Sequence, residues 1–362
     1  MVFMDKQELN ELRIKIDSLD HDIIELLAKR IEVTKSVDKY KLKTGAPRYD
    51  PERWLSASQK RTQLAEELKA SPELVSIVFE DIHTFVLDNV YAMPEACYLG
   101  PEGSFSHIAA KKAVDLGQYR LKACKSWQEL YEQLRSSPDN IAVVPIENSI
   151  SSSVHANVDA LFEGNLYIVG QTYVDINLGL FAKNGTELTD IKQVYSHPQA
   201  LMQATKKIQQ YGWQQHETSS TSAALNYIKN SAEDDVACLA PVSSTAAGVH
   251  QLSDSFQDMQ KNQTRFITIS TKRPQSQTGK KASVLFEVKH ETGSLERLLQ
   301  FLAEQRFNLS KIESRPIPTK TWAYRFWIDL ELGQSTTTEK LVSILDASNH
   351  IESYTILGLY NK

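Results

Sequence analysis

The stretch KNQTRFITIS, residues 261–270, predicts a short buried strand over residues 266–269 whose entrance carries two polar side chains, Thr264 and Arg265. The simplest interpretation is that this pair forms the solvent-exposed end of the strand. From residue 96 to residue 271, short apolar runs alternate with helical stretches, which is typical of an α/β protein. Whether the pair does more than end a strand depends on what the neighbouring strands bring to it.

Several strands of this region end in Ser, Thr, Asn or Glu just where a helix is expected to begin. The stretches are GPEGSFSHIAA, IENSISSSVHANV, SHPQALMQA, TSSTSAAL and PVSSTAAG. Each one alone is explained by ordinary helix capping. Five in one domain indicate a cleft in which helix N-termini and hydroxyls converge on an anion. The stretch GPEGS lacks the spacing of a phosphate-binding loop, so no nucleotide site is predicted.

Taken together, GPEGSFSH, VVPIENS, YSHPQAL, STSAA and NQTRF resemble, in this order and spacing, the prephenate dehydratases. That resemblance covers residues 96–271 and implies two α/β lobes, like those of periplasmic binding proteins, with the active site in the cleft between them. It implies a catalytic set of Thr264, Arg265, Glu147, Asn148, Ser196 and Gln203. It also implies a cleft lining of Ser104, Thr172, Thr221, Ser222 and Phe266.

The chemistry of that family suits these side chains. Prephenate loses carbon dioxide and its ring hydroxyl together, so the enzyme must assist the departing hydroxide and hold the substrate carboxylates. Thr264 is expected to hydrogen-bond the leaving oxygen, and Arg265 to meet a carboxylate and add positive field. Glu147 is the one carboxyl of the set. Which group delivers the proton stays open.

Before residue 90 the pattern is purely helical. An apolar stripe at alternating spacings of four and three runs along a first helix that ends near KTGAP, and its positions are Leu12, Ile16, Leu19, Ile23, Leu26, Arg30, Val33 and Val37. About 38 residues would make this helix roughly 57 Å long. Two shorter helices, starting near Asp50 and Ser71, cannot cover it. An intertwined dimer would.

One arginine, Arg30, interrupts the apolar stripe, and a guanidinium there is costly unless an anion pairs with it. A polar residue that fixes helix register is the simpler interpretation. With ELRIKIDSLDHDIIELLAKR, Lys41 and DPER, however, the region resembles the all-helical chorismate mutases. That resemblance implies a chorismate site in which positioning and electrostatics drive a cofactor-free rearrangement, with the first arginine supplied by a partner subunit. The implied residues are Arg13, Arg30, Lys41, Asp50 and Arg53.

The third helix departs from the mutase pattern. The family's polar pair, four residues apart, aligns with Val86 and Val90, while Thr84 and Asp88 offer the same spacing one helical step away. A dehydratase whose helical region is a degenerate, non-catalytic or regulatory mutase-like domain is therefore an open alternative to the bifunctional enzyme. A non-catalytic amino-acid or carboxylate sensor is a third hypothesis.

After a polar linker, KRPQSQTGKK, the last eighty or so residues predict an α+β sandwich of the βαββαβ type. HETGSLERLLQFL and NLSKIESRP resemble the ferredoxin-like ACT domain, which implies phenylalanine binding and feedback inhibition. A purely structural dimerisation module is the alternative. The implied phenylalanine residues are Gly293, Ser294, Leu295, Glu313, Ser314, Arg315 and Pro316.

Length and composition agree with this multidomain organisation, with expected domains at residues 1–92, 95–272 and 280–362. The net charge of -5 argues against nucleic acid as a partner. The sequence has no run of about 18 apolar residues and no signal-peptide core, so no transmembrane helix or signal peptide is predicted. Three distant cysteines, Cys97, Cys124 and Cys238, favour a reducing cytoplasm, and no metal or cofactor is expected. The expected ligands are chorismate, prephenate and phenylalanine, in a homodimer or higher homo-oligomer.

Overall fold

The computed structural model describes residues 6–44, 46–91, 93–150, 152–259, 261–274, 277–317, 320 and 322–361. The chain divides into two compact units, Met1–Pro94 with Asp115–Arg120, and Glu95–Val114 with Leu121–Lys362. The regions predicted at 95–272 and 280–362 thus fold into one unit. Within the described part of the chain, no helix has the length and apolar character needed to cross a bilayer.

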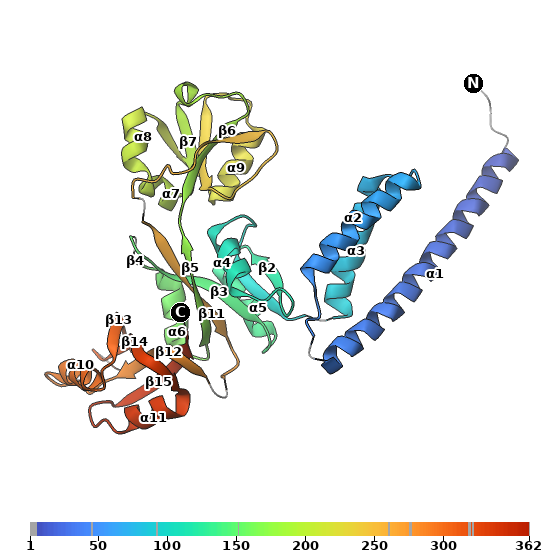
Figure 1. Ribbon diagram of the computed structural model, residues 1–362. Helices are drawn as coiled ribbons and strands as arrows, with labels where there is room; N and C mark the ends of the chain where they lie inside the picture. Colours follow the sequence, from blue (N-terminus) through green and yellow to red (C-terminus); the bar gives the residue numbers. More distant parts are fainter. Residues whose placement is uncertain are drawn as a thin grey trace. The chain divides into compact units, whose positions relative to one another are not determined.

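The first unit is helical, and we call it the helical unit. It contains α1 (Lys6–Thr44), α2 (Pro51–Glu67) and α3 (Pro72–Asn89) (Figure 1). Asp50 caps α2 by accepting a hydrogen bond from the amide of Arg53 at 3.0 Å, which satisfies an N–H that the first helical turn leaves unpaired. Ser71 caps α3 in the same way. The predicted helix starts are confirmed.

The apolar stripe of α1 is open to solvent in the single chain. Leu19, Ile23 and Leu26 are 61%, 54% and 64% exposed. An exposed apolar surface of this length marks an interaction site rather than a free surface. The stripe therefore lacks its cover within one chain.

The second unit begins with a two-lobed α/β region. The first lobe has a mixed sheet in the order β2 (Arg120–Cys124), β1 (Glu95–Leu99), β3 (Ile141–Asn148), β11 (Gln263–Ser270) and β5 (Tyr167–Asp175), with β4 (Ser152–Ser153) paired to β3. The second lobe has the order β10 (Val249–Ser253), β6 (Leu178–Lys183), β9 (Val236–Pro241), β7 (Gln193–Ser196) and β8 (Gln214–Glu217). The chain passes from β5 to β6 and returns from β10 to β11 (Figure 1). These two passages connect the lobes.

Helices flank both sheets and place their first turns near the strand ends. Those of the first lobe are α4 (Phe105–Ala113), α5 (Trp127–Ser136) and α6 (His155–Glu163). Those of the second lobe are the short 3₁₀ turn η1 (Leu188–Asp190), α7 (Pro198–Gln203), α8 (Thr205–Tyr211) and α9 (Thr221–Asn230). The stretch PVSSTAAG was predicted to start a helix, and this prediction is wrong, because residues 242–248 form turns that lead into β10.

The last part of the chain, which we call the C-terminal domain, has the predicted βαββαβ order. Its elements are β12 (Thr278–Glu287), α10 (Ser294–Glu304), β13 (Asn308–Pro316), β14 (Tyr324–Thr337), α11 (Thr338–Asp346) and β15 (Ser353–Tyr360). The strands form one antiparallel sheet in the order β13-β14-β12-β15. One face buries Phe286 and Ile328 with residues of α10 and α11, including Leu298 and Leu341. This is a ferredoxin-like arrangement.

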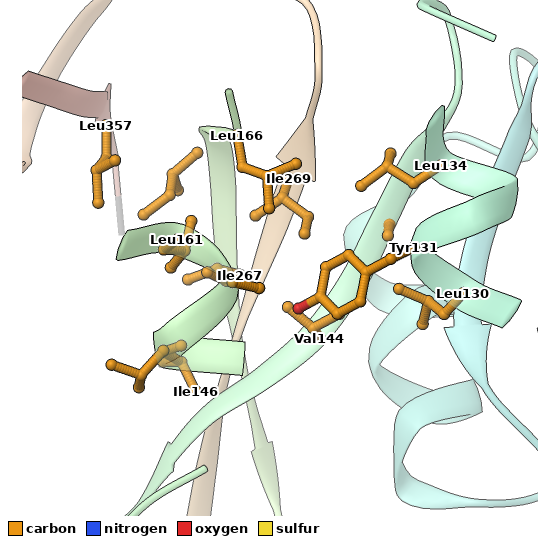
Figure 2. Close-up of a cluster of buried hydrophobic side chains, with 14 of the residues drawn as sticks. Leu130, Tyr131, Leu134, Val144, Ile146, Leu161, Leu166, Ile267, Ile269 and Leu357 are labelled. Carbon is orange, nitrogen blue, oxygen red and sulfur yellow. The ribbon is translucent and has the colours of Figure 1, made fainter. Parts of the chain in front are cut away.

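The other face of this sheet packs on the first lobe. Trp327, Leu285 and Leu357 belong to the same buried cluster as Leu161 and Ile267 of the first lobe. Figure 2 shows Leu357, from β15, in that cluster. The C-terminal domain and the first lobe therefore share one hydrophobic core.

Glycine at position 358 lets β15 approach β5 closely. A Cβ atom at Gly358 would lie under 3.0 Å from the carbonyl oxygen of Ile168. That oxygen is part of the backbone of β5 and cannot move aside as a flexible side chain could. The absence of a side chain is thus a condition for docking the C-terminal domain on the first lobe.

Candidate active sites

A cavity of about 420 Å³ lies between the two lobes of the second unit. Its size suits a small organic acid. Of the residues predicted for this cleft, the following line it: Ser104, Asn148, Gln203, Thr221, Thr264 and Phe266. Elements of both lobes contribute, because β3, β11 and α4 belong to the first lobe whereas α7 and α9 belong to the second.

Thr264 and Arg265 lie on opposite faces of β11. Successive side chains of a strand point to opposite sides of the sheet, and the lining holds Thr264 and Phe266 but, among the described residues, not Arg265. The guanidinium is 2% exposed and bonds Glu147 at 2.8 Å and Asp329 at 2.5 Å. The expectation that Arg265 meets a substrate carboxylate is therefore wrong. Its guanidinium pairs with Glu147 and Asp329 on the other face of the sheet.

The Glu147 side chain also lies on the face of the sheet away from the cavity. Its carboxylate accepts from Arg265 and from Nζ of Lys311 at 3.1 Å, on the side of the sheet away from the cavity. The next residue, Asn148, does line the cavity. Among the described residues, the lining holds no carboxylate and no lysine or arginine. The predicted carboxyl and the predicted cation of the cleft are thus both replaced by neutral groups.

Asn148 and Thr264 form the polar pair of the cavity. They are opposite each other in the β3–β11 ladder, and the Asn148 amide nitrogen donates to Oγ1 of Thr264 at 2.9 Å. The same nitrogen lies 2.7 Å from Oδ1 of Asn262, and Oδ1 of Asn148 accepts from the amide of Ile150. Because Oγ1 already accepts from Asn148, its own hydrogen remains available for a group in the cavity.

A β-bulge turns Asn148 toward the cavity. The ladder pairs Arg265 with Glu147 but Phe266 with Pro145, which leaves Ile146 as an extra residue on β3. Pro145 and Asn148 both line the cavity although they are three residues apart, a spacing that would put them on opposite faces of a regular strand. The bulge is therefore what brings Asn148 to Thr264.

Helix N-termini supply positive electrostatic potential at the cavity, where the described lining residues include no lysine or arginine. The first turn of α4 lines the cavity with Phe105 and Ser106, and α9 begins there at Thr221. Ser104 caps α4, and Ser220 caps α9 by accepting from the amide of Ala223 at 3.0 Å. Unpaired N–H groups and the helix dipole favour an anion at such positions. The predicted convergence of helix starts holds for α4 and α9, and also for α6 and α7, whose N-cap residues Val154 and His197 line the cavity.

The remaining predicted residues of the cleft serve the framework. Ser196 is fully buried and donates to the carbonyl of Leu239 at 2.7 Å. Thr172 is buried on β5 opposite Phe266, and neither Ser196 nor Thr172 lines the cavity. Ser222 donates to the carbonyl of Glu102, a contact that joins the two lobes.

Sequence reasoning missed His197. This residue lines the cavity and caps α7, with Nδ1 accepting from the amide of Gln199 at 3.2 Å. Burial lowers the pKa of His197, and Glu217 opposes that shift only in part, so the ring is neutral at pH 7. Its position directly before Pro198, at the first helical turn, was the available signal.

The helical unit gathers a second set of cations around aromatic rings. The Arg61 guanidinium lies 4.5 Å from the ring centroid of Trp54 and 4.7 Å from that of Phe79. Arg30 lies 5.8 Å from the same Phe79 ring, and its buried Nη1 has no hydrogen-bond partner among the described residues. A buried guanidinium nitrogen without an acceptor marks a position suited to bind an anion.

Arg61 and His83 were not predicted for this site. Arg61 lies seven residues after Trp54 on α2, a spacing that places both on one helix face. His83 stacks on Trp54 with centroids 3.7 Å apart. Burial, with the charges of Arg30 and Arg61, lowers the pKa of His83 to about 4, so it is a neutral hydrogen-bonding group at pH 7.

The predicted mutase residues are not all together in one chain. Arg13 and Arg30 are 17 residues apart on α1, about 26 Å at 1.5 Å per residue, so one small ligand cannot reach both. Lys41 donates to the carbonyl of Arg48 at 2.9 Å. Asp50 is the cap of α2, and Arg53 is exposed.

On α3, His83 stacks on Trp54 beside Arg61, and Ser76 and Glu80 line a pocket that also includes Arg61. Val86 is 4% exposed and Val90 is the C-cap residue of α3. Of the alternative pair, Thr84 is exposed and Asp88 forms an ion pair with Arg120. Neither predicted pair thus supplies a polar side chain beside the cations.

In the C-terminal domain, strand alternation divides the ESRP motif. Glu313 and Arg315 face the first lobe, where Glu313 accepts from Ser153 at 2.8 Å and Arg315 pairs with Asp159 at 2.5 Å. Ser314 and Pro316 are exposed on β13. Of the other predicted residues, Gly293 and Ser294 begin α10 and precede Leu295, with Gly293 at a positive φ of 77°. Oγ of Ser294 accepts from Arg297.

Comparisons with known proteins agree with this division of the chain. A family model for prephenate dehydratase matches residues 96–274, and one for chorismate mutase type II matches residues 12–89. The bifunctional chorismate mutase/prephenate dehydratase of Buchnera aphidicola subsp. Schizaphis graminum is 31% identical over 376 residues, which cover 98% of this chain and 97% of that protein.

Two solved structures are similar to the second unit. The prephenate dehydratase from Staphylococcus aureus is 29% identical with a TM-score of 0.64, over 74% of this chain and 100% of the other. The prephenate dehydratase from Arthrobacter aurescens, in complex with L-Phe, is 27% identical with a TM-score of 0.62, over 74% of this chain and 90% of the other.

Proposed function

This chain belongs to the bifunctional chorismate mutase/prephenate dehydratases, and on that premise we propose which of its residues carry each reaction. The enzyme converts chorismate to prephenate and prephenate to phenylpyruvate, within phenylalanine biosynthesis. For the dehydratase we assign the cavity around Thr264. For the mutase we assign Arg30 and its neighbours in the helical unit, completed by a second copy of the chain.

Prephenate dehydration breaks two bonds and forms a ring double bond. The bond to the ring carboxylate breaks, carbon dioxide departs, and the electron pair moves into the ring as the ring hydroxyl leaves with its own pair. That oxygen needs a proton to depart as water. The enzyme's task is to place a donor at this oxygen and to hold the remaining anionic groups.

Thr264 supplies that donor in our proposal. Asn148 donates to Oγ1 at 2.9 Å and so directs the threonine hydrogen toward the cavity. A hydroxyl is too weak an acid to give up its proton outright, but a hydrogen bond to the developing hydroxide stabilises the transition state more than the ground state. The observation that carries this assignment is the Asn148–Thr264 pair in a cavity whose described lining residues include no carboxylate.

The substrate carboxylates would face the first turns of α4 and α9. Ser104 and Ser220 hold these turns, and the cavity lining lies against them. The two helices have nine and ten residues, long enough for a helix dipole to act on an anion. Backbone N–H groups thus take the part that was expected of Arg265.

For the mutase, Arg30 and Arg61 are the cations of one chain and Arg13 comes from the partner. The distance of about 26 Å along α1 rules out both α1 arginines binding one substrate from the same chain. A second α1 covering the exposed stripe of Leu19, Ile23 and Leu26 would bury that stripe and bring its own arginine. We therefore propose a homodimer through α1.

Separate substrates test the two assignments. Full-length protein supplied with chorismate is expected to consume it, and the same protein supplied with prephenate is expected to form phenylpyruvate, both followed by absorbance. Because Val86 and Val90 stand where the family has a polar pair, the mutase step is the sharper test. Phenylpyruvate from prephenate with no consumption of chorismate would contradict the assignment of Arg30 and Arg61.

Phenylalanine is the proposed effector of the C-terminal domain. Similarity to a prephenate dehydratase in complex with L-Phe supports this ligand class. The exposed Ser314 and Pro316, with the turn at Gly293, are free to contact a ligand, whereas Arg315 is engaged with Asp159 of α6. In this proposal the exposed residues bind phenylalanine, and Arg315 transmits the effect of binding to the first lobe through Asp159.

Arg315→Ala is expected to weaken inhibition by phenylalanine several-fold while phenylalanine still binds. The reason is that Arg315 bonds Asp159 and Glu313 rather than facing an open site. Calorimetric titration measures the binding, and prephenate turnover at increasing phenylalanine measures the inhibition. Arg306→Ala, in the same domain, is the matched control. An unchanged inhibition curve for Arg315→Ala would refute the proposed transmission.

A further inference from the structure

The Arg265 guanidinium is shared between the first lobe and the C-terminal domain. Its four hydrogen bonds reach Gln171 at 2.9 Å and Glu147 at 2.8 Å in the lobe, and Asp329 at 2.5 Å and the Tyr360 hydroxyl at 2.8 Å in the C-terminal domain. At 2% exposure it is one of the largest fully buried side chains. With four hydrogen bonds from its five N–H donors, the buried guanidinium is held in one orientation.

The acceptors in the C-terminal domain are themselves fixed. Asp329 is 0% exposed, accepts from Nε1 of Trp327 at 2.9 Å, and also bonds the Ser283 hydroxyl. Burial on its own would raise the pKa of Asp329, but Arg265 and Lys281 outweigh it and hold the pKa below its ordinary value. The carboxylate is therefore charged at pH 7 and pairs with Arg265.

Glu147 is held from both sides as well. Oε1 accepts from Arg265, and Oε2 accepts from Lys311 of β13 at 3.1 Å. Lys311 also donates to Ser153 at 3.0 Å. Two charged residues of the first lobe thus depend on charged residues of the C-terminal domain for their partners.

These two residues are direct neighbours of the catalytic pair. In the β3–β11 ladder, Arg265 is opposite Glu147 and Thr264 is opposite Asn148, so the two pairs are adjacent rungs. One rung faces the C-terminal domain and the other faces the cavity. Arg265 and Thr264 share a rigid peptide plane, so a displacement of the Arg265 backbone would also move the backbone of Thr264. The ionic contacts that fix Arg265 therefore also help to fix the strand segment that carries the Thr264 hydroxyl.

We propose that Arg265 is a positioning residue for dehydration, through which Asp329 and Tyr360 of the C-terminal domain hold Thr264 in its donating orientation. This inference rests on the role proposed for Thr264. It makes the C-terminal domain part of the dehydratase machinery, apart from any effector. A merely structural role for the same contacts would change stability and the fraction of folded protein, but not the turnover of each folded site.

Tyr360→Phe in the full-length enzyme tests the proposal with the smallest change. It removes the hydroxyl that accepts from Arg265 and keeps the ring. The expected result is a fall of about five- to tenfold in kcat for prephenate with KM within about twofold, because the substrate contacts stay in place. The mutase rate of the same sample should be unchanged and serves as the internal measure of folded protein.

Tyr354→Phe is the matched control. Tyr354 lies on the same strand, β15, and its hydroxyl bonds Asp346 within the C-terminal domain at 2.6 Å, away from Arg265. Its kcat for prephenate should equal that of the unaltered enzyme. An unchanged kcat for Tyr360→Phe, or an equal fall in both variants together with an equal fall in Tm, would overturn the proposal.

The background of Thr264→Ala separates this inference from the role of Thr264 itself. If Tyr360 acts through Thr264, the substitution Tyr360→Phe should have no further effect on the residual turnover of Thr264→Ala. A full additional five- to tenfold loss there would overturn the route through Thr264. If Thr264→Ala alone left turnover intact, the proposed role of Thr264 would fail first, and that result is visible without any change at Tyr360.

Discussion

Thr264→Ala is expected to lower kcat for prephenate dehydration by roughly 10²- to 10⁴-fold, the range for removal of a group that assists proton transfer. Oγ1 accepts from Asn148 at 2.9 Å, which leaves its hydrogen to donate into a cavity whose described lining includes no carboxylate. Without the hydroxyl, only water can donate a hydrogen bond to the departing oxygen. Stopped-assay measurement of phenylpyruvate gives the loss, and chorismate consumption by the same protein should be unaffected.

Two further substitutions sharpen this prediction. Thr264→Ser keeps the hydroxyl and should recover much of the turnover. Thr268→Ala makes the same change four residues further along β11, at a buried position outside the cavity lining, and should leave turnover within about twofold. Turnover by Thr264→Ala equal to that of Thr268→Ala would contradict the role of the hydroxyl.

Arg30→Ala is expected to lower the mutase rate by roughly 10²- to 10³-fold, as for loss of one preorganised charged donor at a transition state. The buried Nη1 of Arg30 has no partner among the described residues and is therefore the group most directly available to an anion. Prephenate turnover of the same sample is the internal control, because Arg30 lies in the helical unit. Unchanged chorismate consumption would refute the assignment.

Complementation separates one-chain from two-chain sites. Arg13→Ala and Arg30→Ala chains are each expected to be nearly inactive as mutases. When the two are co-expressed, random pairing should restore about a quarter of the normal number of sites, because one site of each mixed dimer combines intact Arg30 with intact Arg13. No recovery in verified mixed dimers would show that the two arginines do not share a site across subunits.

Much of the architecture could be predicted from local periodicity. The 3.6-residue pattern predicted three helices before residue 90, and alternating short apolar runs predicted the α/β region and the βαββαβ order that follows. The convergence of α4 and α9 on a cavity could be predicted because capping residues follow strand ends. The helix expected in PVSSTAAG did not form, since the same Ser and Thr residues also suit turns.

The candidate sites were harder, because motifs are linear and sites are not. Arg61 and His83 join Arg30 only through packing of α2 against α3, and no single stretch of sequence contains them. Arg265 finds Asp329 64 residues further along the chain, in a different domain. The partner of a side chain 64 residues away depends on how the two sheets dock. The periodicity of the sequence does not specify that docking.

The sequence by itself determined the types of element and the family resemblances. Neighbours in a strand, such as Thr264 and Arg265, face opposite ways, yet the resemblance led us to expect both of them in the cleft. Only the tertiary structure decided which of them faces the cavity. It did so through the docking of the C-terminal sheet, which buries Arg265 against Asp329, and through the bulge at Ile146, which turns Asn148 to Thr264. The physical reason is that strand alternation is local, whereas the choice of face depends on charges and surfaces brought from distant parts of the chain.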